Sequence, residues 1–123
     1  MSSRSSLIAY LEPLIAATPG LEKIKLVRTV RAVDALSQPT LIVKTDALRK
    51  LPAAPMKKML ASFTLVLVSP HKDVEKAEDQ LDDLLEILLP LLLTWGIVWD
   101  SATQTEFDSE HIAYDIAITS ILS

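Results

Sequence analysis

The chain contains no cysteine and only two glycines among its 123 residues. Without cysteine it has no disulfide framework, no thiolate metal site and no cysteine nucleophile. This composition fits a reducing compartment but does not establish one. Because Gly20 and Gly96 each stand alone, the chain also lacks a glycine-rich phosphate-binding loop. Thiol chemistry and P-loop nucleotide binding are therefore excluded.

No apolar run in the sequence is long enough to cross a bilayer. The longest run, Ile87–Leu93, contains Pro90 and falls far short of the ~20 residues that a membrane-spanning helix needs. The apolar stretch near the N-terminus is interrupted by Glu12 and Pro13, so we expect no cleaved signal peptide. We therefore expect a soluble protein that has no membrane partner.

Hydrophobic residues nevertheless make up 50% of the chain, and the mean hydropathy is +0.32. This value is high for a small soluble monomer, because one small core cannot hide so much apolar surface. Excess apolar surface usually ends in an interface. The composition therefore predicts a homo-oligomer or an obligate partner.

Charge divides the chain into a basic part and an acidic part. Residues 1–72 hold eleven of the twelve Lys and Arg but four of the sixteen Asp and Glu, a net charge of +7. Residues 73–123 hold one Lys and twelve acids, a net charge of −11. Two opposite fields on one small domain suit a protein that stacks against copies of itself or against charged neighbours.

Hydrophobic periodicity predicts one domain over residues 1–123 with two helices and five strands. We expect helices at 6–17 and 74–93, and strands at 23–33, 40–46, 59–69, 97–106 and 110–122. The resulting order, α-β-β-β-α-β-β, predicts an α+β fold: a mainly antiparallel sheet of about five strands with two helices packed on it. Pro13 and Pro90 predict that each helix kinks or ends early.

Three local features sharpen this expectation. Residues 47–58 hold two prolines among four basic residues, so we expect a basic loop between strands. The run 63–68 is apolar at successive positions, which is typical of a central strand covered on both faces. Asp73 is placed to cap the second helix, whose apolar stripe runs Val74, Ala77, Leu81, Leu84, Leu85, Leu88 and Leu92.

The sequence shows no convincing chemical site. His71 and His111 are the only histidines, and neither has a second histidine at ligand spacing. We expect a turn role for His71 and a solvated hairpin with a surface imidazole for His111, although Asp108, Glu110 and Asp115 lie near it in sequence. Trp95 and Trp99 are candidates for an interface anchor, and we expect at least one of them to pack in the core.

Neither charged segment predicts a metal or nucleic-acid site. The carboxylates of the second helix form a row along one face, whereas a hard cation needs converging oxygens. The basic half has no aromatic residue between Tyr10 and Phe63 to stack bases, and the sequence pI is about 5.1. We therefore expect no metal, no cofactor and only transient, non-specific contact with passing DNA.

Several segments resemble a known family. Residues 38–44 (QPTLIVK), 50–55 (KLPAAP), 67–73 (LVSPHKD) running into 76–83 (KAEDQLDD), and 114–118 (YDIAI) resemble the tail terminator proteins of long-tailed, siphovirus-type bacteriophages, especially those of actinobacterial hosts. The resemblance covers most of residues 36–123 in order. Residues 1–35 add only a compatible helix and strand.

The resemblance implies a structural protein without enzymatic activity. Such a protein forms a hexameric ring that caps the tail tube, stops tube growth at the length set by the tape-measure protein, and offers a surface to the head–neck connector. Its partners would be other copies of itself, the tail tube protein, the connector and the tape-measure protein. It would lie at the top of the tail in the virion, and in the host cytoplasm during assembly.

If the protein assembles into a ring, its charged surfaces are the candidate interfaces. Our hypothesis is that the acidic helix face meets a basic face of the neighbouring subunit or of the tube, and that the basic loop contacts the tube or lines the lumen. The candidate interface residues are Arg49, Lys50, Lys57, Lys58, Glu78, Asp79, Asp82, Asp83 and Glu86.

Other functions remain open on sequence grounds. Another neck component, such as a head–tail connector or a tail completion protein, shares the size and the ring symmetry. A regulatory heterodimer partner and a small hydrolase are more remote alternatives. A hydrolase would need a convergent His–carboxylate pocket, which the sequence does not show.

Overall fold

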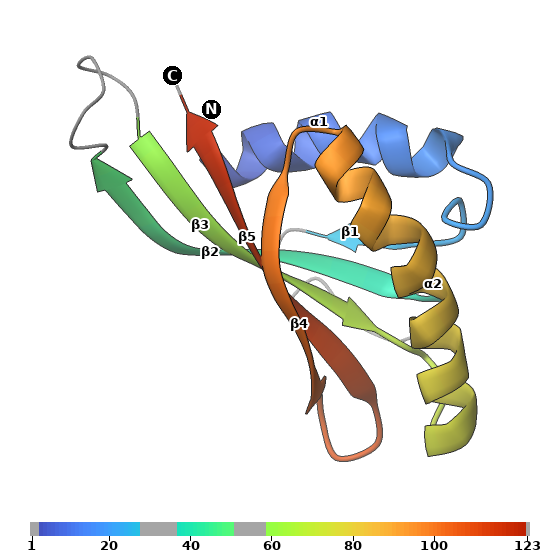
Figure 1. Cartoon of the computed structure of the whole chain (residues 1–123). Coiled ribbons are helices and arrows are strands. Elements are labelled where there is room, and N and C mark those ends of the chain that lie inside the picture. Colours follow the sequence, from blue (N-terminus) through green and yellow to red (C-terminus); the bar gives the residue numbers. More distant parts are fainter. Residues whose placement is uncertain (1–2, 28–36, 51–58, 123) are drawn as a thin grey trace.

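The structure, a computed structural model, describes residues 3–27, 37–50 and 59–122 (Figure 1). The elements are α1 (Ser3–Ala17), β1 (Lys25–Val27), β2 (Thr40–Lys50), β3 (Met59–Val68), α2 (Val74–Thr94), β4 (Val98–Glu106) and β5 (Ile112–Leu122). The predicted α+β class and the order α-β-β-β-α-β-β are confirmed.

The strands form one twisted sheet in the order β1-β2-β3-β5-β4. The sheet is mixed, because β1 pairs parallel to β2 while the other three pairings are antiparallel. β3 is the central strand, as its apolar run predicts. It pairs with β2 along one side and with β5 along the other over its whole length.

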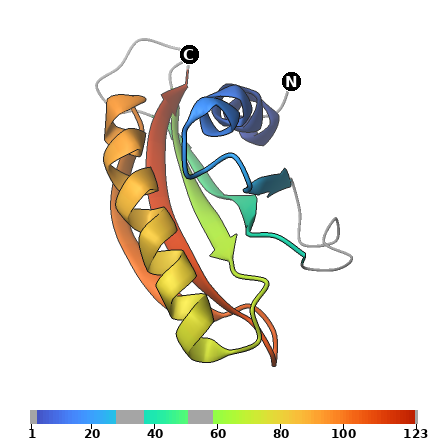
Figure 2. The ribbon, with the colours of Figure 1, turned by 90° about the vertical axis from the view of Figure 1, so that its right-hand side faces the viewer.

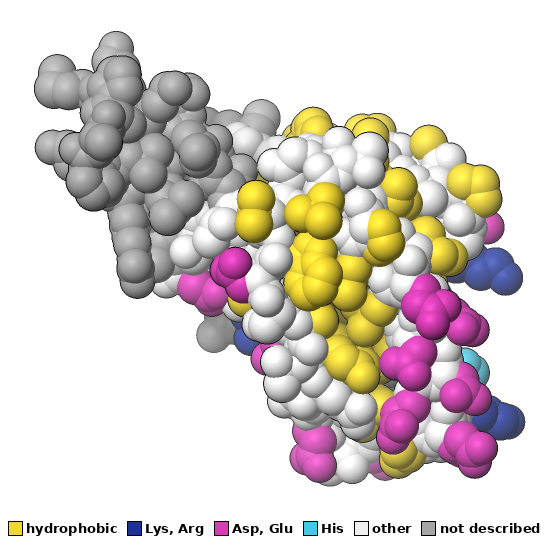
Figure 3. Space-filling model, in the orientation of Figure 1, with side chains coloured by type: hydrophobic (Ala, Val, Ile, Leu, Met, Phe, Trp, Pro, Cys, Tyr) yellow, Lys and Arg dark blue, Asp and Glu magenta, His cyan; other side chains and the backbone are white. Residues whose placement is uncertain are grey.

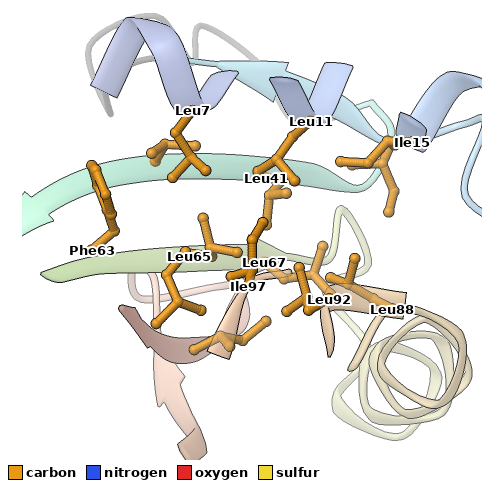
Figure 4. Packing of buried hydrophobic residues seen from close by; sticks show 14 of the residues in the cluster. Leu7, Leu11, Ile15, Leu41, Phe63, Leu65, Leu67, Leu88, Leu92 and Ile97 are labelled. Carbon is orange, nitrogen blue, oxygen red and sulfur yellow. The ribbon is translucent and has the colours of Figure 1, made fainter. Parts of the chain in front are cut away.

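Both helices pack on the same face of the sheet (Figure 2). α1 contacts β1 and β2, and α2 contacts β4 and β5. Leu11 and Ile15 of α1 and Leu88 and Leu92 of α2 point toward the alternating apolar side chains of the strands (Figure 4). These side chains form the main core, because each strand presents every second residue to the helices.

The opposite face of the sheet carries a smaller cluster of buried side chains. Val27, Ile42, Val66, Val68 and Ala113 form it, and Phe107 packs against its edge. Farther along the same face the strands become polar: Lys44 is exposed, and the Thr64 hydroxyl donates to the Asp46 carboxylate.

The two prolines do not end their helices, so that part of the prediction is wrong. α1 continues through Pro13 to Ala17, and α2 continues through Pro90 to Thr94. A proline inside a helix costs about 3 kcal/mol, because it lacks one N–H and crowds the preceding turn. Fully burying one leucine contributes ~1.5–3 kcal/mol. The core side chains next to each proline offset its cost, since Leu11, Leu88 and Leu92 are each 0% exposed.

The strand boundaries also differ from the prediction around the basic segment. β2 extends to Lys50, so residues 47–50 belong to a strand and not to the expected loop. The rest of the predicted loop, residues 51–58 with both prolines, lies outside the described residues. A β-bulge between Thr45 and Ala47 shifts the register of β2 against β3. β1 begins at Lys25, so the predicted start of this strand at residue 23 is two residues too early; residues 28–33 of the predicted strand lie outside the described residues.

The turn between α1 and β1 depends on one glycine. Gly20 has φ +93°, and a Cβ at this position would lie 2.7 Å from the Ile87 Cδ1 atom of α2. Gly96, between α2 and β4, has φ +80° but no heavy atom within 4 Å of such a Cβ. Alanine at position 96 would therefore add backbone strain alone, whereas alanine at position 20 would add backbone strain and a steric contact with Ile87.

We expect Gly96→Ala to lower the free energy of unfolding by ~1 kcal/mol, because alanine is strained at positive φ. Gly20→Ala should lower it further, since its methyl group also meets Ile87. Ile87→Val, which removes Cδ1, should then cost less in the Gly20→Ala background than in the wild type. Denaturant unfolding of the single and double variants measures these differences. Equal losses for the two alanine variants, with no coupling to Ile87, would show that the contact is unimportant.

Candidate docking surface on the second helix

A capping residue fixes the start of α2. The Asp73 carboxylate accepts hydrogen bonds from the backbone N–H groups of Glu75 and Lys76, at 3.0 Å and 3.3 Å. The predicted cap is thereby confirmed. Glu75 lies in the first turn, where the helix dipole favours a negative charge.

The apolar stripe of α2 then sets the orientation of the whole helix. Its buried residues are Ala77, Leu81, Leu84, Leu85, Leu88 and Leu92, which are the predicted ones with a single exception. Val74, the exception, is 55% exposed. It lies in the first helical turn, where it lines a shallow depression with residues of the turn between β4 and β5 rather than facing the sheet.

Burial of this stripe turns a row of carboxylates outward (Figure 3). The row is Glu75, Glu78, Asp79, Asp82, Asp83 and Glu86; all are exposed except Glu78, which is half-buried. None of them takes part in an ion pair with another described side chain. The acidic half of the predicted interface thus lies on one continuous face.

An apolar strip borders the carboxylate row on its sheet side (Figure 3). Leu85, Leu89 and Pro90 line a shallow groove of about 440 Å³ together with Asp82 and Glu86. Beside the α2–β4 turn, Leu93 and Val98 are 57% and 53% exposed. An exposed apolar strip rimmed by charges is typical of a protein–protein docking surface.

Tyr114 shows that the negative field of α2 reaches the sheet. Its hydroxyl donates to the Gln104 side-chain oxygen at 3.5 Å. Burial raises the pKa of this hydroxyl, and the neighbouring carboxylates of Asp82 and Glu78 raise this pKa further. A partner for this surface would therefore carry positive charge around an apolar centre.

A second apolar feature lies where α1 meets the α2–β4 turn. Leu7, Tyr10, Phe63, Trp95 and Ile97 line a cleft of about 260 Å³. The Tyr10 hydroxyl donates to the Trp95 backbone carbonyl at 2.7 Å. Trp95 and Trp99 are both half-buried and pack against the main core, which confirms the predicted core role. The contact between Tyr10 and Trp95 joins residues far apart in the chain, so no local pattern could have indicated it.

The basic half of the predicted interface is only partly described. Arg49 and Lys50 are the last residues of β2, and their side chains are not described. Lys57 and Lys58 lie outside the described residues. Whether the four meet the acidic row stays a prediction.

Hydrogen bonds in the turns of the structure hold both histidines. In the turn between β3 and α2, the His71 backbone N–H donates to the Ser69 hydroxyl oxygen at 3.3 Å, and that hydroxyl donates to the Gln80 side-chain oxygen at 2.6 Å. His71 therefore has the turn role that we predicted. Over residues 3–27, 37–50 and 59–122, no three His, Asp or Glu side chains gather so that they could hold a metal ion.

His111 differs from the prediction of a solvated imidazole, because its side chain is only 12% exposed. Its Nδ1 atom lies 2.8 Å from an Asp108 carboxylate oxygen, which also accepts from the backbone N–H groups of Glu110 and His111 at 2.8 Å each. Strand alternation would separate these side chains, but residues 107–111 form a turn, where it does not apply. Lys72 and Glu110 add an exposed ion pair at 3.1 Å.

No protein-family model matches this chain. None of the curated proteins matches its sequence significantly either. In the part of the chain that is described, no helix is both long and apolar enough to cross a membrane.

The turn between β4 and β5 makes the free energy of unfolding depend on pH in the acid range. The backbone N–H of Glu110, with smaller contributions from His111, lowers the pKa of Asp108 below its ordinary value. A carboxyl whose pKa falls on folding stabilises the fold above its unfolded pKa of about 3.9, and this contribution is lost as pH falls through the lowered folded pKa.

We expect Asp108→Ala to lower the free energy of unfolding at pH 7 by ~1 kcal/mol, because three donors lose their acceptor. Asp108→Asn keeps an acceptor without the charge, so its smaller loss should shrink as the wild-type carboxyl becomes protonated below pH 4. Denaturant unfolding from pH 7 to pH 3 compares the three proteins. A pH-independent gap between the wild type and Asp108→Asn would contradict the assigned role of the charge.

Proposed function

We propose that this protein is a phage tail terminator: a ring-forming structural subunit that caps the tail tube and ends tube polymerisation. The observation that carries the proposal is the ordered series of segments resembling tail terminators over residues 36–123. One of these segments, residues 67–83, contains the Asp73 cap and the first carboxylates of α2. The family resemblance and the candidate docking surface therefore coincide.

The arrangement of charge supports an assembly role. A cyclic ring uses heterologous interfaces, in which one patch of a subunit meets a different patch of the next. The exposed acidic row of α2 is one such patch. The excess of Lys and Arg in residues 1–72 supplies opposite charge for a second patch.

The mechanism in this proposal is recognition without a chemical step. One side of the ring would bind the last ring of the tail tube, and the ring would offer no surface on which another tube ring could grow. Its other side would receive the head–neck connector, while the tape-measure protein sets the length at which capping occurs. The basic loop, with Lys57 and Lys58, would contact the tube or line the lumen.

Repulsion within the carboxylate row lowers the stability of the helix, which supports a role of the row in binding. Asp79 and Asp83, like Asp82 and Glu86, are four residues apart on one helix face, and each like-charge pair of this kind destabilises a helix by ~0.2–0.5 kcal/mol. None of these four carboxylates forms an ion pair with a described cation. A positively charged partner would remove this repulsion on docking.

Charge reversal tests the acidic face directly. We expect Asp79→Lys/Asp82→Lys/Asp83→Lys to prevent ring assembly and tube capping, because these exposed side chains would then repel the basic partner surface. Light scattering and electron microscopy of mixtures with tail tubes measure both outcomes. Glu12→Lys, an exposed reversal on α1, is the control and should assemble normally. Normal assembly and capping by the triple variant would refute this interface.

Replacing carboxylates of α2 by neutral amides distinguishes their effect on monomer stability from their effect on assembly. We expect Asp79→Asn/Asp83→Asn to raise the free energy of unfolding of the monomer by a few tenths of a kcal/mol, since the repulsion of these two carboxylates from each other and from their acidic neighbours one turn away on α2 is relieved. The same variant should assemble more weakly than the wild type. Thermal unfolding at a concentration that favours monomers gives the first quantity, and light scattering gives the second. A variant that is less stable and also assembles weakly would indicate a structural role for the carboxylates.

Phage genetics tests the function itself. Removal of a tail terminator from its phage should give overlong tails, and supplying this protein should restore normal length. Electron microscopy measures the tail-length distribution. Tails of normal length that remain unattached to heads would instead identify a head–tail connector.

A further inference from the structure

β4 lies at the end of the described sheet, with β5 on one side and no described strand on the other. The internal segments outside the described residues belong to other parts of the chain: residues 28–36 follow β1, and residues 51–58 lie between β2 and β3. Figure 3 views β4 from the front, and no grey atoms cover the strip between β4 and α2. A partner can therefore reach β4 beside α2.

The backbone groups of β4 point alternately toward β5 and away from it. At the hairpin, the Phe107 N–H donates to the His111 carbonyl at 2.9 Å, so this N–H faces β5. Inward and outward groups alternate along an antiparallel edge strand. The N–H of Thr105 therefore faces β5, whereas the N–H and C=O groups of Gln104 and Glu106 face outward. Such outward groups are a template for pairing with another chain.

Apolar side chains of β4 face the same side of the sheet as α2. Trp99 and Ala102 pair with Ile118 and Ile116, which are buried in the main core. Residues paired directly across two strands share one face of the sheet. Trp99 and Ala102 are both half-buried, so each still exposes part of its apolar surface beside the helix.

α2 forms the other wall of this strip, and its character changes along its length. The helix and β4 run in opposite directions (Figures 1 and 2), so the C-terminal part of α2 lies beside the start of β4. That part is apolar, with Leu89 in the shallow groove and Leu93 57% exposed. Earlier in the helix the wall is acidic: after burial, the carboxylates of Asp82 and Glu78 raise the pKa of Tyr114 on the neighbouring strand.

We propose that an extended segment of a partner protein adds to the outer side of β4, next to α2, and that this segment carries Lys or Arg. In this binding mode main-chain hydrogen bonds provide affinity, and alternate side chains provide specificity. Every second side chain of the added strand faces α2. An apolar one lies beside Trp99 and Ala102, and a basic one farther along lies beside Asp82 and Glu78. This inference rests on the proposed assembly role of the acidic face and specifies the form of the partner there.

Charge and a bulge narrow the choice of partner. β4 contains Asp100 and Glu106 but no Lys or Arg, so pairing with β4 of another copy would place like charges together. A basic segment instead meets opposite charge on both β4 and α2. The bulge between Trp99 and Ser101 interrupts the ladder, which leaves Ser101–Glu106 as the regular run for pairing.

Peptide binding followed by amide hydrogen exchange tests the proposal. The probes are the end-blocked peptide Leu-Thr-Leu-Thr-Lys-Thr-Lys and its reverse, because a parallel and an antiparallel strand use the same outward groups. We expect one of the two to bind saturably by calorimetry. By NMR, binding should slow exchange of the outward amides of Gln104 and Glu106, whereas exchange at Thr105, whose N–H already faces β5, should change little.

Variants separate the backbone contribution from the charge contribution. Gln104→Pro removes one outward N–H, and edge strands accept proline at such positions. It should keep the wild-type circular dichroism spectrum but bind the peptide roughly tenfold more weakly, since one main-chain hydrogen bond is lost. Gln104→Ala is the matched control and should bind as the wild type does. Glu78→Gln/Asp82→Asn should weaken binding and reduce its dependence on salt, whereas Glu12→Gln, on the exposed side of α1, should change neither.

Several results would overturn strand addition. They are binding without slower exchange at Gln104 and Glu106, equal binding of the scrambled peptide Leu-Leu-Thr-Thr-Lys-Lys-Thr, and binding of neither alternating peptide. These outcomes are separate from the test of function. A chain that binds no peptide yet restores tail length would refute strand addition and leave the terminator role intact. A chain that binds the peptide but does not restore tail length would do the reverse.

Discussion

Burial of one stripe of α2 against the sheet determines the surface of this protein. Leu81, Leu88 and Leu92 are fully buried against the sheet, and Asp73 caps the helix that carries them. Because side chains follow each other around a helix at fixed intervals, the carboxylates of α2 must then face outward. The acidic row and its apolar border are therefore consequences of core packing.

The sequence predicts this part of the structure well, because hydrophobic spacing and capping are local signals. The alternating residues of β5 and the central position of β3 follow from the same kind of pattern. The continuation of the two helices through Pro13 and Pro90 could not be predicted in this way. A proline penalty is local, but the burial of Leu11 and Leu92 that offsets it depends on strands elsewhere in the chain.

The candidate site was predictable only in part for the same reason. The row from Glu78 to Glu86 lies on one helix, so its spacing already places it on one face. The neighbourhood of Tyr114 and the contact of Tyr10 with Trp95 bring together residues that are distant in the chain. The position of β4 at the end of the described sheet follows from strand order, which no local pattern specifies. His111 and Asp108 meet because residues 107–111 turn, and the predicted hairpin did not specify which of its side chains would be in contact.

The account assigns to one subunit an acidic docking face with an apolar border. This face favours association of the chain with itself or with basic partners, and salt should weaken the association through screening. The most direct test is the molar mass of the wild-type chain in solution at low and high ionic strength. The account predicts six times the 13.5 kDa of one chain at low salt, and smaller species at high salt. A mass of one chain at both salt concentrations would contradict it.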